Sequence, residues 1–160
     1  MILRSILSRS GRLLAAMTIA LCAVAATPVR ADENPAPADP ALLPVFKQFG
    51  EKPGLIALME DFMVLLVDDP RTRPFFADAD QLHVKQELVD QFCVILGGPC
   101  KYEGKGMKEA HEKLVINEAQ FNALVENLQK AMDKHDIPFR AQNKLLEKLA
   151  PMQREVINKR

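Results

Sequence analysis

The sequence predicts a single all-α domain with four main helices and a short fifth one. Apolar residues recur at spacings of three and four in several long stretches, which is the period of a helix with one buried face. No stretch shows the sustained alternation of apolar and polar residues that a half-buried strand requires. Glycine, proline and aspartate residues separate the apolar stretches, as expected where helices end. The chain therefore consists of amphipathic helices that bury their apolar stripes against one another.

Residues 1–31 have the layout of a secretory signal peptide. Arg4, Arg9 and Arg12 precede an apolar run over residues 13–26, and residues 29–31 resemble a small-x-small cleavage site. The run is too short to span a bilayer comfortably, and an uncleaved N-terminal anchor is the alternative. We therefore expect an exported, periplasmic protein that meets the membrane only through this segment before cleavage.

Charge and composition argue against two classes of function. Four of the 21 basic residues and none of the 21 acidic residues lie in residues 1–31, so the remainder carries a net charge of −4. Nucleic-acid binding relies on clustered positive charge, and no basic patch is visible. No serine follows Ser10 and no other nucleophile arrangement stands out, so a hydrolase has little support.

Two cysteines, Cys93 and Cys100, remain once the signal segment with Cys22 is removed. An oxidising compartment permits a disulfide between them. The alternative is that Cys93, beside Phe92 in a helical stretch, is a small buried hydrophobe. Together with His83 and His111 they lack the compact ligand spacing of a structural zinc site.

The first helices follow a proline-rich stretch. Residues 32–44 contain four prolines among alanine and aspartate, which indicates a flexible linker and a domain of residues 45–160. Gly50 and Pro53 mark a turn, and residues 68–70 close the helix after it. Its apolar residues recur at helical spacing: Leu55, Leu58, Met59, Phe62, Met63 and Leu66.

The next helix is expected to begin at Asp80, whose side chain can cap it, and to end at Gly97, which tolerates positive φ. Its apolar face is Val84, Leu88, Phe92 and Leu96, widened by Leu82, Val89 and Ile95. A long helix then opens at Asn117 with Gln120 in a capping box. Its inner residues are Phe121, Leu124, Val125, Leu128 and Met132. After a break at residues 135–138, a last helix follows, kinked at Pro151.

Residues 96–111 carry the most specific signal. Gly97, Gly98 and Pro99 stop one helix, Tyr102-Glu103-Gly104 follows, and a short helix places Met107 one turn before His111. In these residues the chain resembles the group 1 truncated haemoglobins. The resemblance runs from about Phe49 to Ile157 and implies a truncated globin, a two-over-two helical sandwich around haem b. It also implies that His111 is the proximal ligand of the haem iron.

The resemblance assigns further pocket positions one by one. Phe62 matches the aromatic residue on the first pocket helix, and Phe76 matches the ring that stacks on the haem face. Val84 and Leu88 match the distal side with Phe92 behind them, whereas Phe121 and Leu124 match the proximal half. Lys108 would lie near a propionate, although a solvated lysine is the simpler interpretation. The implied haem-binding set is Phe62, Met63, Phe76, Val84, Leu88, Phe92, Tyr102, Met107, Lys108, His111, Phe121 and Leu124.

Two positions depart from the family pattern. The residue after Phe62 is usually tyrosine and is Met63 here, and the position of Leu88 often carries glutamine. Both family residues donate hydrogen bonds to a bound gas. We therefore predict an apolar distal pocket, which argues against efficient oxygen storage and against nitric-oxide dioxygenation. His83, one residue from Val84, is the nearest polar candidate if the helix is rotated; otherwise it lies in solvent.

The leading hypothesis is an exported globin that reversibly binds a diatomic gas (oxygen, nitric oxide or carbon monoxide) at haem iron. One alternative is a haem protein that exchanges electrons with a small redox partner protein. Another is a haem-free helical binding module on a globin scaffold. The presence of a haem absorption band separates the last alternative from the other two.

Overall fold

The computed structural model describes residues 34–158. The predicted signal peptide lies outside these residues, and it stays a prediction. Within the described part the structure is helical, without strands. The elements in order are η1 (Pro40–Leu42), α1 (Leu43–Gln48), α2 (Glu51–Asp68), α3 (Arg73–Phe76), α4 (Gln81–Ile95), α5 (Met107–His111), α6 (Glu118–Lys134), α7 (Phe139–Leu149), η2 (Ala150–Met152) and α8 (Gln153–Val156).

The packed part of the domain includes residues before Val45, where the sequence placed the start of the domain. The Asp39 side chain accepts a hydrogen bond from the Ala41 backbone, and Pro40 lies in the first turn of η1. Proline is well suited to this position because its nitrogen has no hydrogen to leave unpaired. Ala36 and Leu42 are buried in the core. Residues 34–44 are therefore packed on the domain, and the flexible-linker interpretation is wrong for them.

Helix α2 supplies the largest share of the core. Its buried residues are the six that helical spacing predicted: Leu55, Leu58, Met59, Phe62, Met63 and Leu66. Gly50 precedes the helix in the left-handed region, with φ of 75°. Glycine adopts this conformation without strain.

Helix α4 begins and ends where the sequence predicted. The Asp80 side chain accepts a hydrogen bond from the His83 backbone, 3.1 Å away, and Gly97 ends the helix with φ of 75°. The expected inward position of Leu82 is wrong, because that side chain is 74% exposed. Leu82 lies in the first turn of α4, about two turns before the buried Val89 and on the same side of the helix, so its exposure comes from its place at the helix end.

Helix α6 has both hydrogen bonds of the predicted capping box, between Asn117 and Gln120. His135 ends it, and a short connection leads to α7. Pro151 interrupts the last helix as expected, because α7 gives way there to the 3-10 turn η2 and then to α8. A proline cannot donate the hydrogen bond that would continue an α-helix.

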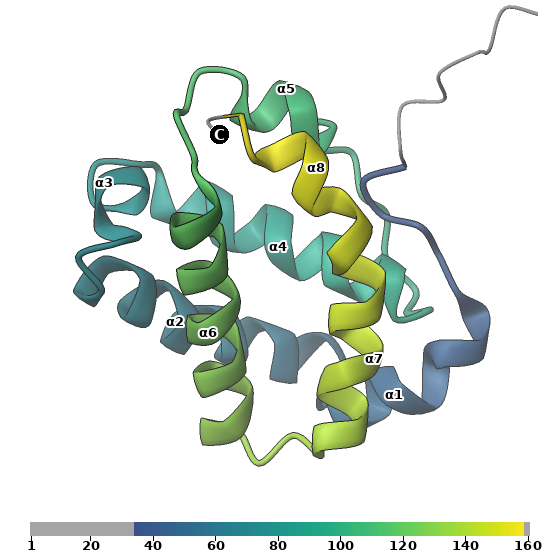
Figure 1. Ribbon diagram of the computed structural model, residues 1–160. Helices are drawn as coiled ribbons and strands as arrows, with labels where there is room; N and C mark the ends of the chain where they lie inside the picture. The colour runs from purple at the N-terminus through teal and green to yellow at the C-terminus, as the bar shows by residue number, and fades with distance from the viewer. Residues whose placement is uncertain (1–33, 159–160) are drawn as a thin grey trace, which may run out of the picture. The chain divides into compact units, whose positions relative to one another are not determined.

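The four long helices form two layers of two. In Figure 1, α2 and α4 run beside each other, and α6 and α7 cross in front of them. The connection at residues 135–138 turns the chain back, so α6 and α7 are antiparallel. The short α5 lies beside α8 at one end of this arrangement. This is the two-over-two sandwich of the truncated globins.

Cys93 and Cys100 form a disulfide, which decides between the two interpretations of these residues. Their Cα atoms are 5.9 Å apart, and the bond joins the last turn of α4 to the loop that leads to α5. Cys93 is also fully buried. The bond thereby fixes the start of the loop that carries the chain toward His111.

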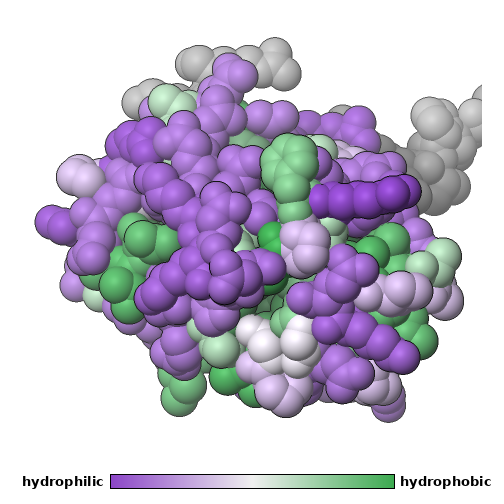
Figure 2. Space-filling view, turned by 90° about the horizontal axis from the view of Figure 1, so that it is seen from below, coloured by the Kyte–Doolittle hydropathy of each residue, from purple (hydrophilic) through white to green (hydrophobic). Residues whose placement is uncertain are grey.

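The surface in Figure 2 is mainly hydrophilic, and hydrophobic residues appear on it in small separate groups. Among the described residues, the large hydrophobic side chains that are exposed are spread over several elements: Leu43, Ile56, Val64, Leu82, Val115 and Phe139. Exposed hydrophobic side chains that are scattered in this way are common on protein surfaces. In the described part of the chain, none of the helices combines the length and the apolar character needed to cross a bilayer.

Candidate functional site

The imidazole of His111 is held in one orientation by its own helix. Its Nδ1 atom lies 2.7 Å from the carbonyl oxygen of Met107, one turn earlier in α5. A carbonyl oxygen only accepts hydrogen bonds, so Nδ1 must carry the proton and donate. The neutral ring then leaves Nε2 unprotonated, with a lone pair free for a metal ion. The side chain is half-buried.

Most side chains assigned to the pocket are apolar and only partly buried. Phe62, Met63 and Phe92 are buried in the helical core, whereas Lys108 is exposed to solvent. The half-buried members of the set are Phe76, Val84, Leu88, Tyr102, Met107, Phe121 and Leu124. These residues come from α3, α4, α5, α6 and the loop before α5.

Four polar residues near the start of α4 are paired or exposed to solvent. Gln81 donates to the Phe76 carbonyl at 3.2 Å, and Lys85 pairs with Glu60 at 2.5 Å. Gln86 donates to Asp90 at 2.9 Å. His83 is exposed, with its backbone nitrogen bonded to the helix cap. The structure therefore gives His83 the solvent position that the sequence left as one of two options.

Gln91 is a buried polar residue that the sequence analysis did not single out. It is 4% exposed, and its Nε2 atom donates to the Pro35 carbonyl at 2.6 Å. The same nitrogen lies 3.9 Å from the sulfur atoms of Met107 and Met152. Gln91 therefore joins α4 to the N-terminal segment, to α5 and to the last helical turns. The hint in the sequence is that Leu88 and Ile95, three residues before and four residues after Gln91, are apolar and lie on the same side of the helix.

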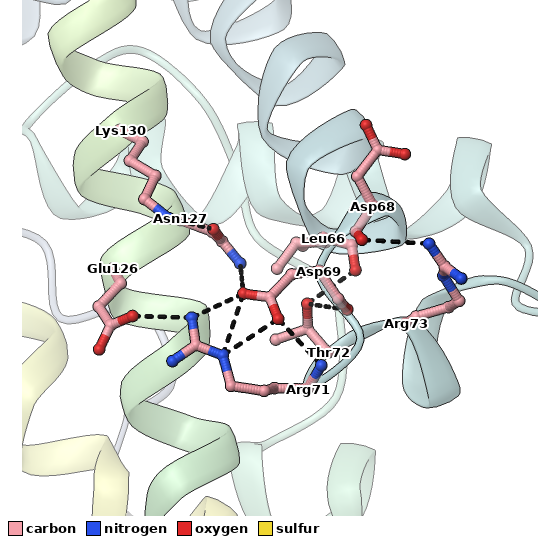
Figure 3. Close-up of polar contacts among 9 residues, drawn as sticks. All are labelled: Leu66, Asp68, Asp69, Arg71, Thr72, Arg73, Glu126, Asn127 and Lys130. Atoms are coloured by element: carbon pink, nitrogen blue, oxygen red, sulfur yellow. Dashed lines mark hydrogen bonds and ion pairs between the residues drawn. The ribbon is translucent and has the colours of Figure 1, made fainter.

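A polar network fixes the corner that carries Phe76 (Figure 3). The Asp69 carboxylate accepts from the Arg71 guanidinium at 2.7 Å and from the Asn127 amide at 3.0 Å. Arg71 also pairs with Glu126 at 2.8 Å, so the turn before α3 is tied to α6. The Arg71 guanidinium is the main cause of an Asp69 pKa well below its usual range. This network positions α3, and with it the Phe76 ring, relative to α6.

The hydroxyl of Tyr102 donates to the Lys105 carbonyl at 2.9 Å, within the loop before α5. Burial is the main cause of a raised Tyr102 pKa, and the nearby negative charge of Glu87 adds to it. The phenol therefore stays protonated and holds the loop in shape.

The fold and the site together define a small helical protein whose short helix α5 carries a half-buried histidine. The chain belongs to the bacterial-like globin family, whose model matches residues 44–158.

Its relatives are group 1 truncated haemoglobins. The protein of Tetrahymena pyriformis is 31% identical over 84 residues, which covers 52% of this chain and 69% of that relative. The protein of Mycolicibacterium paratuberculosis is 27% identical over 112 residues, which covers 70% of this chain and 82% of that relative.

Solved structures agree on the fold. The Fe(III) form of the truncated haemoglobin from Tetrahymena pyriformis has a TM-score of 0.68 at 24% identity, covering 72% of this chain and 98% of that one. The 2/2 haemoglobin from a Synechococcus species, in the cyanomet state with covalently attached haem, has a TM-score of 0.67 at 21% identity with the same coverage. At these identities the likeness concerns the fold alone.

Membership in the globin family implies haem binding, and the residues present fit that group. A haem requires apolar walls and one strong axial donor. His111 offers an imidazole whose second nitrogen is already committed to a carbonyl. Such a second contact fixes the tautomer and the direction of a metal-binding histidine. The half-buried apolar side chains of α3, α4 and α6 would form the walls.

Proposed function

We propose that this protein reversibly binds a diatomic gas at the iron of a haem b group held by His111. The bound haem would supply an iron atom with one open axial position for the gas. The contact between His111 Nδ1 and the Met107 carbonyl carries this proposal, because it leaves Nε2 as the donor. The protein's own residues would provide this ligand, the apolar walls and the exclusion of water.

The distal side is proposed to be apolar. The side chains of Met63, Val84 and Leu88 carry no hydrogen-bond donor. Met63 is buried, and Val84 and Leu88 are half-buried. Two other donors on α4, Gln81 and Lys85, are engaged with Phe76 and Glu60, and the His83 side chain is exposed to solvent. A polar ligand such as dioxygen gains about 1.5–3 kcal/mol from a charge-assisted hydrogen bond. Without it, weak oxygen binding beside ordinary carbon monoxide binding is expected.

Non-covalent haem is the form that the cysteines support. Cys93 and Cys100 are bonded to each other, so neither offers a free thiol for attachment to a haem vinyl group. The haem should therefore pass into the organic phase when the protein is extracted with acidified butanone. Haem that stays with the protein would argue for a covalent link and against haem b.

Absorption spectra of the ferric, ferrous and carbonmonoxy forms test the proposal directly. Purified protein should have a Soret band in each form, and the ferrous band should shift when carbon monoxide is added. A colourless protein that takes up no added haem would favour a haem-free binding module. A haem protein that changes oxidation state readily but binds no gas would favour electron exchange with a redox partner.

We propose export on the basis of the signal-peptide layout of residues 1–31. The disulfide between Cys93 and Cys100 agrees with an oxidising compartment, because such bonds are rare in the reducing cytosol.

A further inference from the structure

The helix that carries His111 has few stabilising contacts of its own. Helix α5 has only five residues, its first turn lacks a side-chain cap, and none of its residues is buried. A helix leaves its last carbonyl groups without partners inside the helix. Many helices are closed by a glycine in the left-handed conformation. Here the capping residue is Glu112, whose backbone is right-handed.

Asn158 supplies hydrogen bonds to the segment that follows α5. Its Nδ2 atom donates to the His111 carbonyl at 3.3 Å and to the Leu114 carbonyl. Its Oδ1 atom accepts from the Ile116 backbone nitrogen at 2.9 Å, and its own backbone nitrogen donates to the Ile116 carbonyl at 3.2 Å. The side chain thus uses both of its amide hydrogens and its oxygen on one short stretch of chain.

The stretch bound by Asn158 is the end of the histidine helix. The His111 carbonyl also accepts from the Leu114 nitrogen at 3.1 Å, so the turn after α5 closes on the same atom. Ile116 and Val156 are both buried, which anchors the two segments that Asn158 joins. The orientation of the imidazole depends on Met107 and His111 staying in one intact helical turn.

We propose that Asn158 is a positioning residue for His111, and this rests on the proposed role of His111 as the iron ligand. The Asn158 amide holds the C-terminal end of α5, so that the imidazole stays aligned on the iron. Contacts beyond the first ligand commonly tune a metal-binding histidine in this way. Without the amide donors the end of α5 frays and the histidine–iron bond becomes weaker and less uniform.

The Asn158→Asp substitution removes the two donors and keeps the acceptor and the backbone bond. A carboxylate would also repel the His111 and Leu114 carbonyl oxygens. Asn158→Ala removes the whole side-chain contact and serves as the second variant, should the aspartate interfere with folding. Asn143→Asp, the same chemical change at an exposed position of α7, is the matched control.

The iron–histidine stretching band in the resonance Raman spectrum of the ferrous, ligand-free protein is the main readout. Both Asn158 variants should shift this band to lower frequency and broaden it, and Asn143→Asp should leave it in place. Haem transfer to an excess of haem-free myoglobin should be about three to ten times faster for the Asn158 variants, the effect of about one lost hydrogen bond.

A band unchanged in position and width in both Asn158 variants would overturn the positioning role. A lower unfolding temperature with an unchanged band would overturn it too, because Asn158 would then act on stability alone. If the unmutated protein takes up haem but lacks an iron–histidine band, both the ligand assignment and this proposal fail. Haem binding with an unaffected band in the variants overturns only the role of Asn158.

Discussion

The Nδ1 atom of His111 donates a hydrogen bond to the carbonyl oxygen of Met107, 2.7 Å away and one helical turn earlier. The two residues belong to α5, a helix of five residues that lies beside α8. A local backbone contact therefore selects the tautomer of the ring, and no acidic side chain is needed for this. His135 differs in this respect, because its Nε2 atom lies 2.8 Å from the Asp61 carboxylate. The two histidines offer a matched comparison.

Replacing His111 with alanine should abolish or greatly weaken haem retention, because it removes the axial donor. His135→Ala should leave the spectrum unchanged, since His135 is committed to Asp61 at the junction of α6 and α2. Haem titration of both proteins, followed at the Soret band, measures the difference. Normal haem binding by the His111→Ala protein would refute the assignment.

Reducing the disulfide should destabilise the protein by about 2–3 kcal/mol, the value expected from chain entropy for so short a closed loop. Chemical unfolding with and without a reductant measures this change in the free energy of unfolding. Cys100→Ala provides the control, because a protein without the bond should not respond to the reductant. Cys100 suits this purpose better than Cys93, which is fully buried. Two titratable thiols per folded chain under oxidising conditions would contradict the bond.

Acid should weaken the corner that carries Phe76. The pKa of Asp69 is lowered in the folded protein, mainly by Arg71, whereas a free aspartate titrates near 4. A group with a lowered pKa contributes stability above its unfolded pKa and loses it as the pH falls toward its folded pKa. The free energy of unfolding should therefore decrease below about pH 4.

The Asp69→Asn variant should depend less steeply on pH over this acidic range than the unmutated protein. Asp39, Asp61 and Asp90 also have lowered pKa values, so some acid sensitivity should remain in the variant. Urea unfolding at a series of pH values gives the slopes, with the exposed neighbour Asp68→Asn as control. Equal slopes for Asp69→Asn and the unmutated protein would remove Asp69 from this explanation.

Local signals in the sequence predicted most of the fold. The Asp80 cap, the Asn117–Gln120 capping box and the apolar face of α2 each depend on residues within a few positions of one another. The contacts that the sequence did not predict join distant segments. Asn127 reaches Asp69 across 58 residues, Gln91 reaches Pro35 across 56, and Asn158 reaches His111 across 47.

Polar residues that make such long-range bonds look like ordinary surface residues in the sequence. Leu82 is the opposite case, because its apolar character and its helical spacing to Val89 suggested burial, and only its place in the first turn of α4 leaves it in solvent. The prediction of a flexible linker over residues 32–44 was wrong for residues 34–44 for a related reason. Pro40 and Pro44 lie in first turns, where they start helices, and the burial of Leu42 is visible only in the packed structure.

The mature protein should begin at or near Asp32, because residues 1–31 have the three parts of a signal peptide. Protein made in a secreting host should be recovered from the periplasm or the medium, and its mass should correspond to the shortened chain. Mass spectrometry of the intact protein measures this. A cytoplasmic product that keeps its N-terminal methionine would count against export.

The Met63→Tyr substitution tests the apolar distal pocket. Met63 is 4% exposed in α2, at the position where the family usually has a tyrosine, so the new hydroxyl should reach the gas ligand. One added hydrogen bond of about 1–2 kcal/mol should slow oxygen release by about tenfold or more. Carbon monoxide, which is far less polar when bound, should be affected much less. Stopped-flow displacement of oxygen by carbon monoxide measures release from both proteins, and Met63→Phe controls for the volume of the ring.

Slow oxygen release from the unmutated protein would mean that a polar group already reaches the ligand. His83 would then be the first to replace, and a low-spin spectrum without added ligand would identify it as a second iron ligand. Either result would require α4 to turn relative to its position here, since the His83 side chain is exposed in this structure.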